Sequence, residues 1–131
     1  MHSCIISLAA NTHQEENLAE ARERLSRILL DIDYTIELWT EPYNAKESKG
    51  ATEQKLYLNQ LAFAQTELSV EELAKALKEI ERSMGRNETD RQSGIVRIDL
   101  DLMQYDQTKH HLRDWERPYI QELLNTPTHR A

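Results

Sequence analysis

The sequence predicts an α+β domain whose elements follow in the order strand, helix, strand, strand, helix, strand, with one further helix at the end. Short apolar runs alternate with stretches in which apolar residues recur at helical spacing. The segment 41–54 joins two predicted strands without a helix between them. A loop in this place favours a split β-α-β-β-α-β unit over a doubly wound parallel sheet. We therefore expect a ferredoxin-like sheet with helices on one face, followed by a C-terminal helix.

The first predicted strand and helix lie close together at the start of the chain. Residues 3–9 form a short apolar run that is typical of a buried central strand. Thr12 and Glu15 then match a capping box, which predicts a helix over 13–30. Its apolar stripe consists of Leu18, Ala21, Leu25, Ile28 and Leu29.

Two more strands flank a long polar segment. The β-branched and aromatic residues of 33–40 predict the second strand, and 56–66 predicts the third. Between them, 41–54 has no apolar period and carries proline and glycine, so we expect a long loop. Loops of this length in compact domains are usually functional or mobile. The segment is therefore a candidate lid beside a site on the sheet.

The second half of the chain predicts two helices and a loop. Ser69 and Glu72 match a second capping box, and Gly85 suits the C-terminal end of the helix they open. The stripe of this helix consists of Leu73, Ala76, Leu77, Ile80 and Met84. The polar residues 86–94 predict a loop, and Pro118 suits the first turn of the last helix.

Composition restricts the class of protein. The 131 residues suit one domain, 1–131, with one core. The net charge of −7 argues against a general nucleic-acid binder, which needs a basic surface. One cysteine excludes an intrachain disulfide, and no apolar run has the length of a membrane span. We expect a cytoplasmic monomer that binds neither nucleic acid nor membrane.

The predicted strand 95–103 carries the clearest chemical pattern. Its period of two places Val96, Ile98, Leu100 and Leu102 on one face and Arg97, Asp99, Asp101 and Met103 on the other. Asp99 and Asp101 then point the same way, about 6–7 Å apart at the backbone. Paired carboxylates suit Mg²⁺, which takes oxygen ligands and often keeps waters and phosphates besides. The alternative is an exposed strand face on which one aspartate pairs with Arg97.

Four motifs in 57–86 and 98–106 follow one another at compatible spacing. They are the aromatic-x-Asn start at Tyr57 and Asn59, L-S-x-E-E-L from Leu68, I-E-x-x-x-G-R from Ile80, and I-D-L-D from Ile98. As an ordered set they resemble the 6-hydroxymethyl-7,8-dihydropterin pyrophosphokinase family, and the resemblance covers the chain to about Leu124. It implies transfer of pyrophosphate from ATP to the pterin's hydroxymethyl oxygen in folate biosynthesis. It also implies two Mg²⁺ ions held by the paired aspartates.

The resemblance assigns roles to individual residues. It implies catalytic roles for Asp99, Asp101, Arg86 and His111, and metal ligation by the two aspartates. It implies ATP binding by Glu81, Arg86, His111 and Arg117, and pterin binding by Thr40, Pro42, Tyr57, Asn59 and Tyr119. Without a glycine-rich P-loop, phosphates must be held by metal and side chains.

Ordinary structural readings stay open for several of these residues. Tyr57 and Tyr119 also suit core or rim positions, and Arg86 also suits a helix C-terminus. His110 and His111 are equally placed in sequence for the histidine role, and a surface pair can be incidental.

The chain departs from the family pattern in places. Only Asn11 remains of a G-S-N turn after the first strand, and 101–111 is shorter than in the family, which has a further hairpin there. In the loop before I-D-L-D, Glu88 and Val96 stand where the family has arginines, and Ser93 stands where it has an aromatic residue. Arg91 and Arg97 are close enough in sequence to take the place of those arginines. These changes favour an alternative, a catalytically degenerate paralogue that binds a pterin, a nucleotide or a protein partner.

Overall fold

The computed structural model describes residues 1–42, 56–85 and 87–131, and it describes Arg91 by its backbone alone. The elements are β1 (His2–Ala10), α1 (Gln14–Leu25), β2 (Leu30–Tyr34), β3 (Leu38–Thr40), β4 (Tyr57–Thr66), α2 (Val70–Ser83), α3 (Glu88–Gln92), β5 (Asp99–Tyr105), β6 (Thr108–Lys109), α4 (Leu112–Trp115), α5 (Pro118–Leu124) and β7 (His129–Arg130). Most of the predicted loop 41–54 lies outside the described residues.

The strands form an antiparallel sheet in the order β6-β5-β1-β4-β2-β7, and β3 also pairs with β4. β1 is the central strand and pairs with β4 along its whole length, from His2 opposite Thr66 to Ala10 opposite Leu58. The four principal strands therefore lie in the order β5-β1-β4-β2. This arrangement confirms the predicted ferredoxin-like β-α-β-β-α-β fold.

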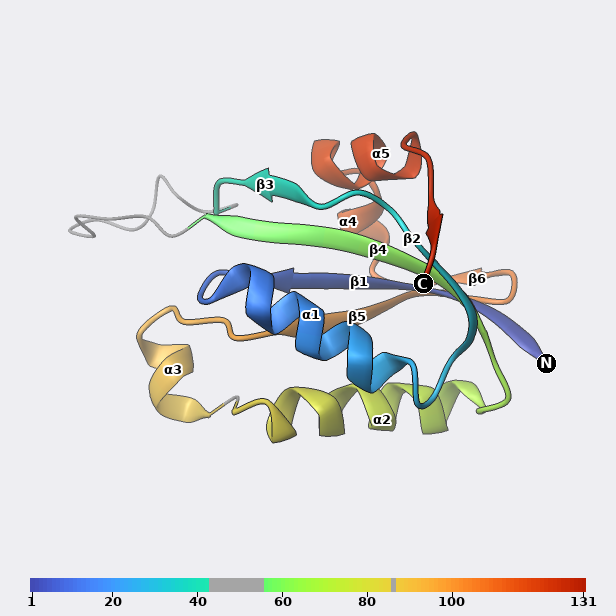
Figure 1. The fold of residues 1–131 in the computed structure, drawn as a ribbon, viewed down its shortest axis with the longest axis horizontal. Helices are drawn as coiled ribbons and strands as arrows, with labels where there is room; N and C mark the ends of the chain where they lie inside the picture. The colour runs from blue at the N-terminus through green and yellow to red at the C-terminus, as the bar shows by residue number, and fades with distance from the viewer. Residues whose placement is uncertain (43–55, 86) are drawn as a thin grey trace.

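Helices cover the sheet unequally on its two faces. α1 and α2 lie side by side on one face, where the larger core forms, and α4 and α5 lie on the other (Figure 1). The smaller core on that second face consists of Leu61, Met103, Ile120 and Leu123. Ile98, Leu100 and Leu102 belong to the larger core, as the strand period predicts. The intervening Asp99 and Asp101 therefore face the side of α4 and α5.

Of the two predicted capping boxes, the structure contains one. The Ser69–Glu72 capping box is present, with Glu72 N donating to Ser69 Oγ at 3.2 Å and Ser69 N donating to Glu72 Oε1 at 2.9 Å. The capping box predicted at Thr12 is wrong, because His13 is the N-cap, with φ of 40° and no side-chain capping bond. α1 also ends at Leu25 instead of residue 30.

The predicted last strand and its surroundings need three corrections. β5 begins at Asp99 instead of residue 95, so Arg97 precedes the strand. The predicted loop 86–94 contains the short helix α3. Although the segment after Asp101 is short, β6 pairs with β5 there and makes a small hairpin. None of the helices in the described residues has the length and apolar character needed to cross a membrane.

The predicted strand 33–40 is two strands, separated at Thr35, whose side chain is 1% exposed. Thr35 Oγ1 accepts a hydrogen bond from Leu61 N at 3.0 Å and donates one to Ile36 O at 2.9 Å. The hydroxyl thus takes the place of a backbone acceptor in the ladder, and the chain bends. β3 then resumes pairing with β4, where Leu38 lies opposite Asn59 and Thr40 opposite Tyr57.

Replacing Thr35 with valine should destabilise the fold by about 1–3 kcal/mol, because Leu61 N–H loses its buried acceptor. The isosteric change leaves packing nearly constant. Thr35→Ser keeps the hydroxyl and loses one methyl, which costs about 1 kcal/mol or less. Urea unfolding of the two variants measures the difference; a valine variant as stable as the serine variant would contradict this role of the hydroxyl.

Candidate functional site

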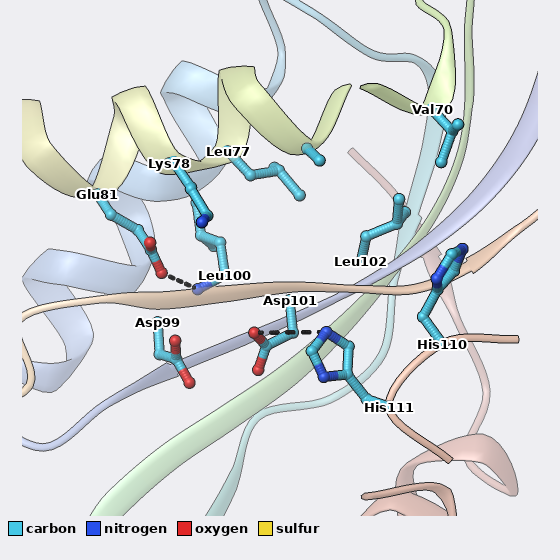
Figure 2. Close-up of a pocket in the computed structure, with 11 residues that line it drawn as sticks. Val70, Leu77, Lys78, Glu81, Asp99, Leu100, Asp101, Leu102, His110 and His111 are labelled. Atoms are coloured by element: carbon cyan, nitrogen blue, oxygen red, sulfur yellow. Dashed lines mark hydrogen bonds and ion pairs between the residues drawn. The ribbon is translucent and has the colours of Figure 1, made fainter. Parts of the chain in front are cut away.

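The two strand carboxylates lie on an open part of the sheet. Asp99 pairs in register with Ala9 of β1, and Asp101 pairs with Ser7. Both neighbours are small and partly exposed, so they leave room above the sheet. Figure 2 shows the carboxylates projecting from β5 on the side away from α2. The structure therefore confirms that Asp99 and Asp101 share a face.

The pair is electrostatically strained. The pKa of Asp101 is raised to about 7, first by burial and then by the charge of the neighbouring Asp99, with a smaller contribution from Glu81. His111 opposes this shift, with Nε2 3.9 Å from Asp101 Oδ1. Partly desolvated carboxylates held close together attract a cation.

This donor set suits Mg²⁺ more than a metal that needs an all-protein cage. No group of three or more His, Cys, Asp or Glu residues in the described ranges could hold a metal ion. Mg²⁺ commonly takes one or two carboxylates and completes its shell with phosphate oxygens and water. Asp99 and Asp101 fit that pattern when a phosphate ligand is also present.

Glu81 fixes the strand that carries the aspartates. It is 7% exposed, and its Oε2 accepts a hydrogen bond from the backbone N–H of Leu100 at 2.8 Å. This bond satisfies a backbone donor at the edge of β5, where β6 does not reach. Glu81 therefore connects α2 to the strand segment between the two aspartates.

A pocket with a volume of about 360 Å³ lies along this edge. Its lining comes from α2 (Val70, Ala74, Leu77, Lys78, Glu81), from β5 (residues 99–102) and from His110 and His111. One end is apolar and the other is acidic. The pocket brings four predicted residues together, namely Glu81, Asp99, Asp101 and His111 (Figure 2).

Both histidines line the pocket, but their surroundings differ. His111 lies beside Asp101, whereas His110 Nε2 is buried and has no hydrogen-bond partner in the described part of the chain. Trp115 holds this segment, because its Nε1 lies 2.9 Å from His110 O and 3.1 Å from Met103 O. No sequence pattern indicates this role, since Trp115 lies in a short polar stretch without apolar period.

The predicted pterin residues gather on the neighbouring strands. Asn59 pairs with Ala9 on one side and Leu38 on the other, so it lies in the same row as Asp99, two strands away. Two strand spacings make about 10 Å. Asn59 is 4% exposed, and its Nδ2 donates to Thr40 Oγ1 at 2.8 Å and Leu38 O at 3.0 Å. Pro42 follows directly beyond this strand pair.

The two candidate tyrosines both lie within electrostatic reach of the aspartates. Burial raises the pKa of Tyr57, and the Asp99 charge raises it further. Burial is also the largest cause raising the pKa of Tyr119, where Arg117 opposes it and both Asp101 and Asp99 add to it. The tyrosines come from β4 and from the first turn of α5. The sheet and α5 thus bring both aromatic side chains to the carboxylate face.

Asn11 is a structural residue of the site whose role the sequence did not reveal. Its Oδ1 accepts from Val96 N at 2.6 Å, and its Nδ2 donates to Gly94 O at 2.8 Å. A side-chain hydrogen bond with Asn11 also lowers the pKa of Tyr57. Asn11 therefore ties the segment before β5 to the end of β1 and to Tyr57. Its sequence indicated only that Asn11 is the residue kept from the family's G-S-N turn after the first strand.

The structure describes only some of the arginines that were predicted to bind phosphates. Arg86 lies outside the described residues, as does the side chain of Arg91. Arg117 Nε lies 2.9 Å from Asp114 Oδ1. The idea that Arg97 shares the carboxylate face is wrong, because it precedes β5 and its Nε lies 2.6 Å from Asp90 Oδ2. Arg97 is thus engaged away from the aspartates and is a poor substitute for a lost phosphate-binding arginine.

Removing the charge of Asp101 should stabilise the metal-free protein at high pH. A raised folded-state pKa means that stability falls as pH rises from the unfolded value, about 4, through about 7. Asp101→Asn should therefore gain on the order of 2 kcal/mol over wild type at pH 8, after allowance for solvent screening, and almost nothing at pH 4. Urea unfolding in EDTA at both pH values measures this, with exposed Glu79→Gln as control. If the free energy of unfolding changed with pH equally in wild type and Asp101→Asn, the proposed destabilisation by the Asp101 charge would be contradicted.

Known proteins with similar sequences show the family of this chain. The chain is 31% identical over 124 residues to a folate synthesis bifunctional protein of Arabidopsis thaliana, covering 88% of this chain and 25% of that protein. It is 40% identical over 81 residues to the mitochondrial folate synthesis bifunctional protein of Pisum sativum, covering 56% and 16%. The chain thus spans a quarter or less of these relatives. The family model for 7,8-dihydro-6-hydroxymethylpterin-pyrophosphokinase matches residues 5–129, and the chain belongs to that family.

Proposed function

We propose that the chain transfers a pyrophosphoryl group from ATP to the hydroxymethyl oxygen of 6-hydroxymethyl-7,8-dihydropterin, a step of folate biosynthesis. The hydroxymethyl oxygen attacks the β-phosphorus, the bond from that phosphorus to the α–β bridging oxygen breaks, and AMP leaves. The hydroxyl proton is lost to solvent. One observation carries the proposal: paired carboxylates separate a nucleotide-sized pocket from a row of pterin-compatible side chains two strands away.

The carboxylates would hold two Mg²⁺ ions through Asp99 and Asp101. Such ions supply neutralisation of the charge on the transferring phosphates. The other residues then act by position: His111 beside Asp101 and Arg117 at the start of α5 can donate to phosphate oxygens. Arg86 keeps the same proposed role from its motif alone.

The pterin side would use shape and hydrogen bonding. Tyr57 and Tyr119 offer aromatic faces to a flat heterocycle, and Thr40 and Pro42 border it. The Nδ2 of Asn59 already donates hydrogen bonds to β3, so its Oδ1 is the atom suited to accept a hydrogen bond from the edge of the pterin. Two strand spacings, about 10 Å, place this edge within a molecule's length of the metal-binding carboxylates.

Compartment and assembly stay predictions. The sequence favours a cytoplasmic monomer that binds ATP and a pterin, whereas the pea relative is named as mitochondrial. Gel filtration of the purified chain and localisation of the tagged full-length protein address these two points.

AMP release from Mg·ATP, with and without 6-hydroxymethyl-7,8-dihydropterin, tests the reaction. Release should depend on the pterin, and Asp99→Asn and Asp101→Asn should each lower it by at least about a hundredfold, since each removes a metal ligand. Asp31→Asn provides the matched control, because Asp31 is exposed at the distant pairing of β2 with β7. Activity that survives in both strand variants would contradict the metal role.

A second function is favoured by one specific observation. Arg97 is engaged with Asp90, while Glu88, Ser93 and Val96 replace family residues in the same segment. A chain short of phosphate-binding cations can bind its ligands without turnover. Binding of Mg·ATP and pterin without AMP release at high enzyme concentration would establish the degenerate paralogue. Pterin-dependent AMP release would exclude it.

A further inference from the structure

Trp115 lies outside the pocket lining but contacts the segment that carries His111. It is the last residue of the short helix α4, and its partly buried indole packs against the smaller core. The ammonium of Lys109, on β6, lies 4.6 Å from the centre of the indole ring and makes a cation–π contact with it. Core packing and this contact together fix the position of the ring.

The indole N–H of Trp115 closes the turn that leads into His111. Nε1 lies 2.9 Å from His110 O and 3.1 Å from Met103 O, so the donor is shared between two carbonyls. Met103 O also accepts a hydrogen bond from His110 N at 2.9 Å. The residue before His111 is therefore held at both its N–H and its C=O, and it is anchored to β5 two residues after Asp101.

His111 needs such support because its backbone is in the left-handed region. Its φ is 52°, a conformation that residues other than glycine adopt rarely and at a cost in energy. On its other side, His111 O accepts a hydrogen bond from Asp114 N at 2.8 Å. The backbone is thus held before and after His111, and the imidazole presents Nε2 at 3.9 Å from Asp101 Oδ1 (Figure 2).

We propose that Trp115 is a positioning residue that acts through His111, because its indole N–H holds the backbone that presents the imidazole to Asp101 and to a bound phosphate. This assignment rests on the proposed function. Without the indole N–H, His110 O loses this donor and the turn loosens, so the imidazole samples other orientations and binds phosphate less well. Trp115 then affects the reaction only as long as His111 is present.

A double-mutant cycle tests this coupling, because a residue that acts through another has no effect once the other is removed. The cycle compares Trp115→Phe in the wild-type chain and in His111→Ala, and the measured quantity is kcat/KM for Mg·ATP. Trp115→Phe keeps an aromatic ring and loses the N–H. It should lower kcat/KM about tenfold in the wild-type chain and less than about twofold in His111→Ala.

The other tryptophan of the chain provides the matched control. Trp39 lies on β3 and is 48% exposed, so Trp39→Phe should change kcat/KM less than about twofold. A second replacement of Trp115 separates the N–H from the size of the ring: 3-benzothienylalanine has sulfur in place of the N–H and keeps the shape of the indole. It should reproduce the loss seen in Trp115→Phe, even if the smaller phenylalanine leaves a cavity that unfolds the chain.

Binding of Mg·α,β-methylene-ATP, which cannot be cleaved between its α- and β-phosphates, repeats the cycle without turnover. Calorimetry should again show a loss of affinity that depends on His111. Equal losses in the wild-type and His111→Ala backgrounds would overturn the assignment, as would unchanged activity and binding of the benzothienylalanine protein; neither result contradicts the proposed reaction. A wild-type chain that binds the analogue but releases no AMP would overturn the proposed reaction, and the binding cycle would still decide the role of Trp115.

Discussion

Repulsion between two carboxylates on one strand face is the interaction on which the site depends. Asp99 and Asp101 are held side by side although burial and their mutual charge raise the pKa of Asp101 to about 7. The strand tolerates this because Leu100 and Leu102 on its other face belong to the larger core, as does Ile98 just before the strand. Glu81 adds a buried hydrogen bond to Leu100 N between the two aspartates. The apolar face and this bond offset the cost of the charged one, and a bound cation would relieve it.

The order of strands in the sheet places the two aspartates between two separate regions of the site. Small residues on β1 leave the carboxylate face open, and the row through Ala9 leads from Asp99 to Asn59. On the other side, the edge of β5 borders the pocket that α2 completes. β1 thus lies between the region suited to the pterin and the strand that carries the proposed metal ligands. The order β5-β1-β4 makes this separation a property of the fold.

The sequence predicted those parts that depend on local period. The split order of strands and helices, the faces of β5 and the second capping box all follow from apolar spacing or from a four-residue motif. The break at Thr35 could not be predicted, because Thr35 and Ile36 continue a β-branched pattern and only Leu61, distant in sequence, reveals the bend. α1 was predicted too long since Ile28 and Leu29 continue its helical stripe after the chain has turned.

The candidate site residues also divide into those that local period predicted and those that depend on contacts between distant segments. Asp99, Asp101 and His111 meet because two of them share a strand period and the β5–β6 hairpin returns the third. Arg97 was misplaced because the period of two was extended past the start of β5, where Asn11 holds the backbone of Val96 instead. Its partner Asp90 lies on α3, which apolar spacing does not predict. Pairings between separate segments need the tertiary structure.

The most direct test of the paired-carboxylate site is paramagnetic broadening of backbone amide signals by Mn²⁺, a substitute for Mg²⁺, in the presence of α,β-methylene-ATP. The account predicts that signals of residues 99–102 and His111 broaden first, that Asn59 broadens less, and that residues of α1 near Leu18 stay sharp. Asp101→Asn should weaken the effect. Broadening centred elsewhere, or broadening that persists unchanged in that variant, would contradict a metal site at the paired aspartates.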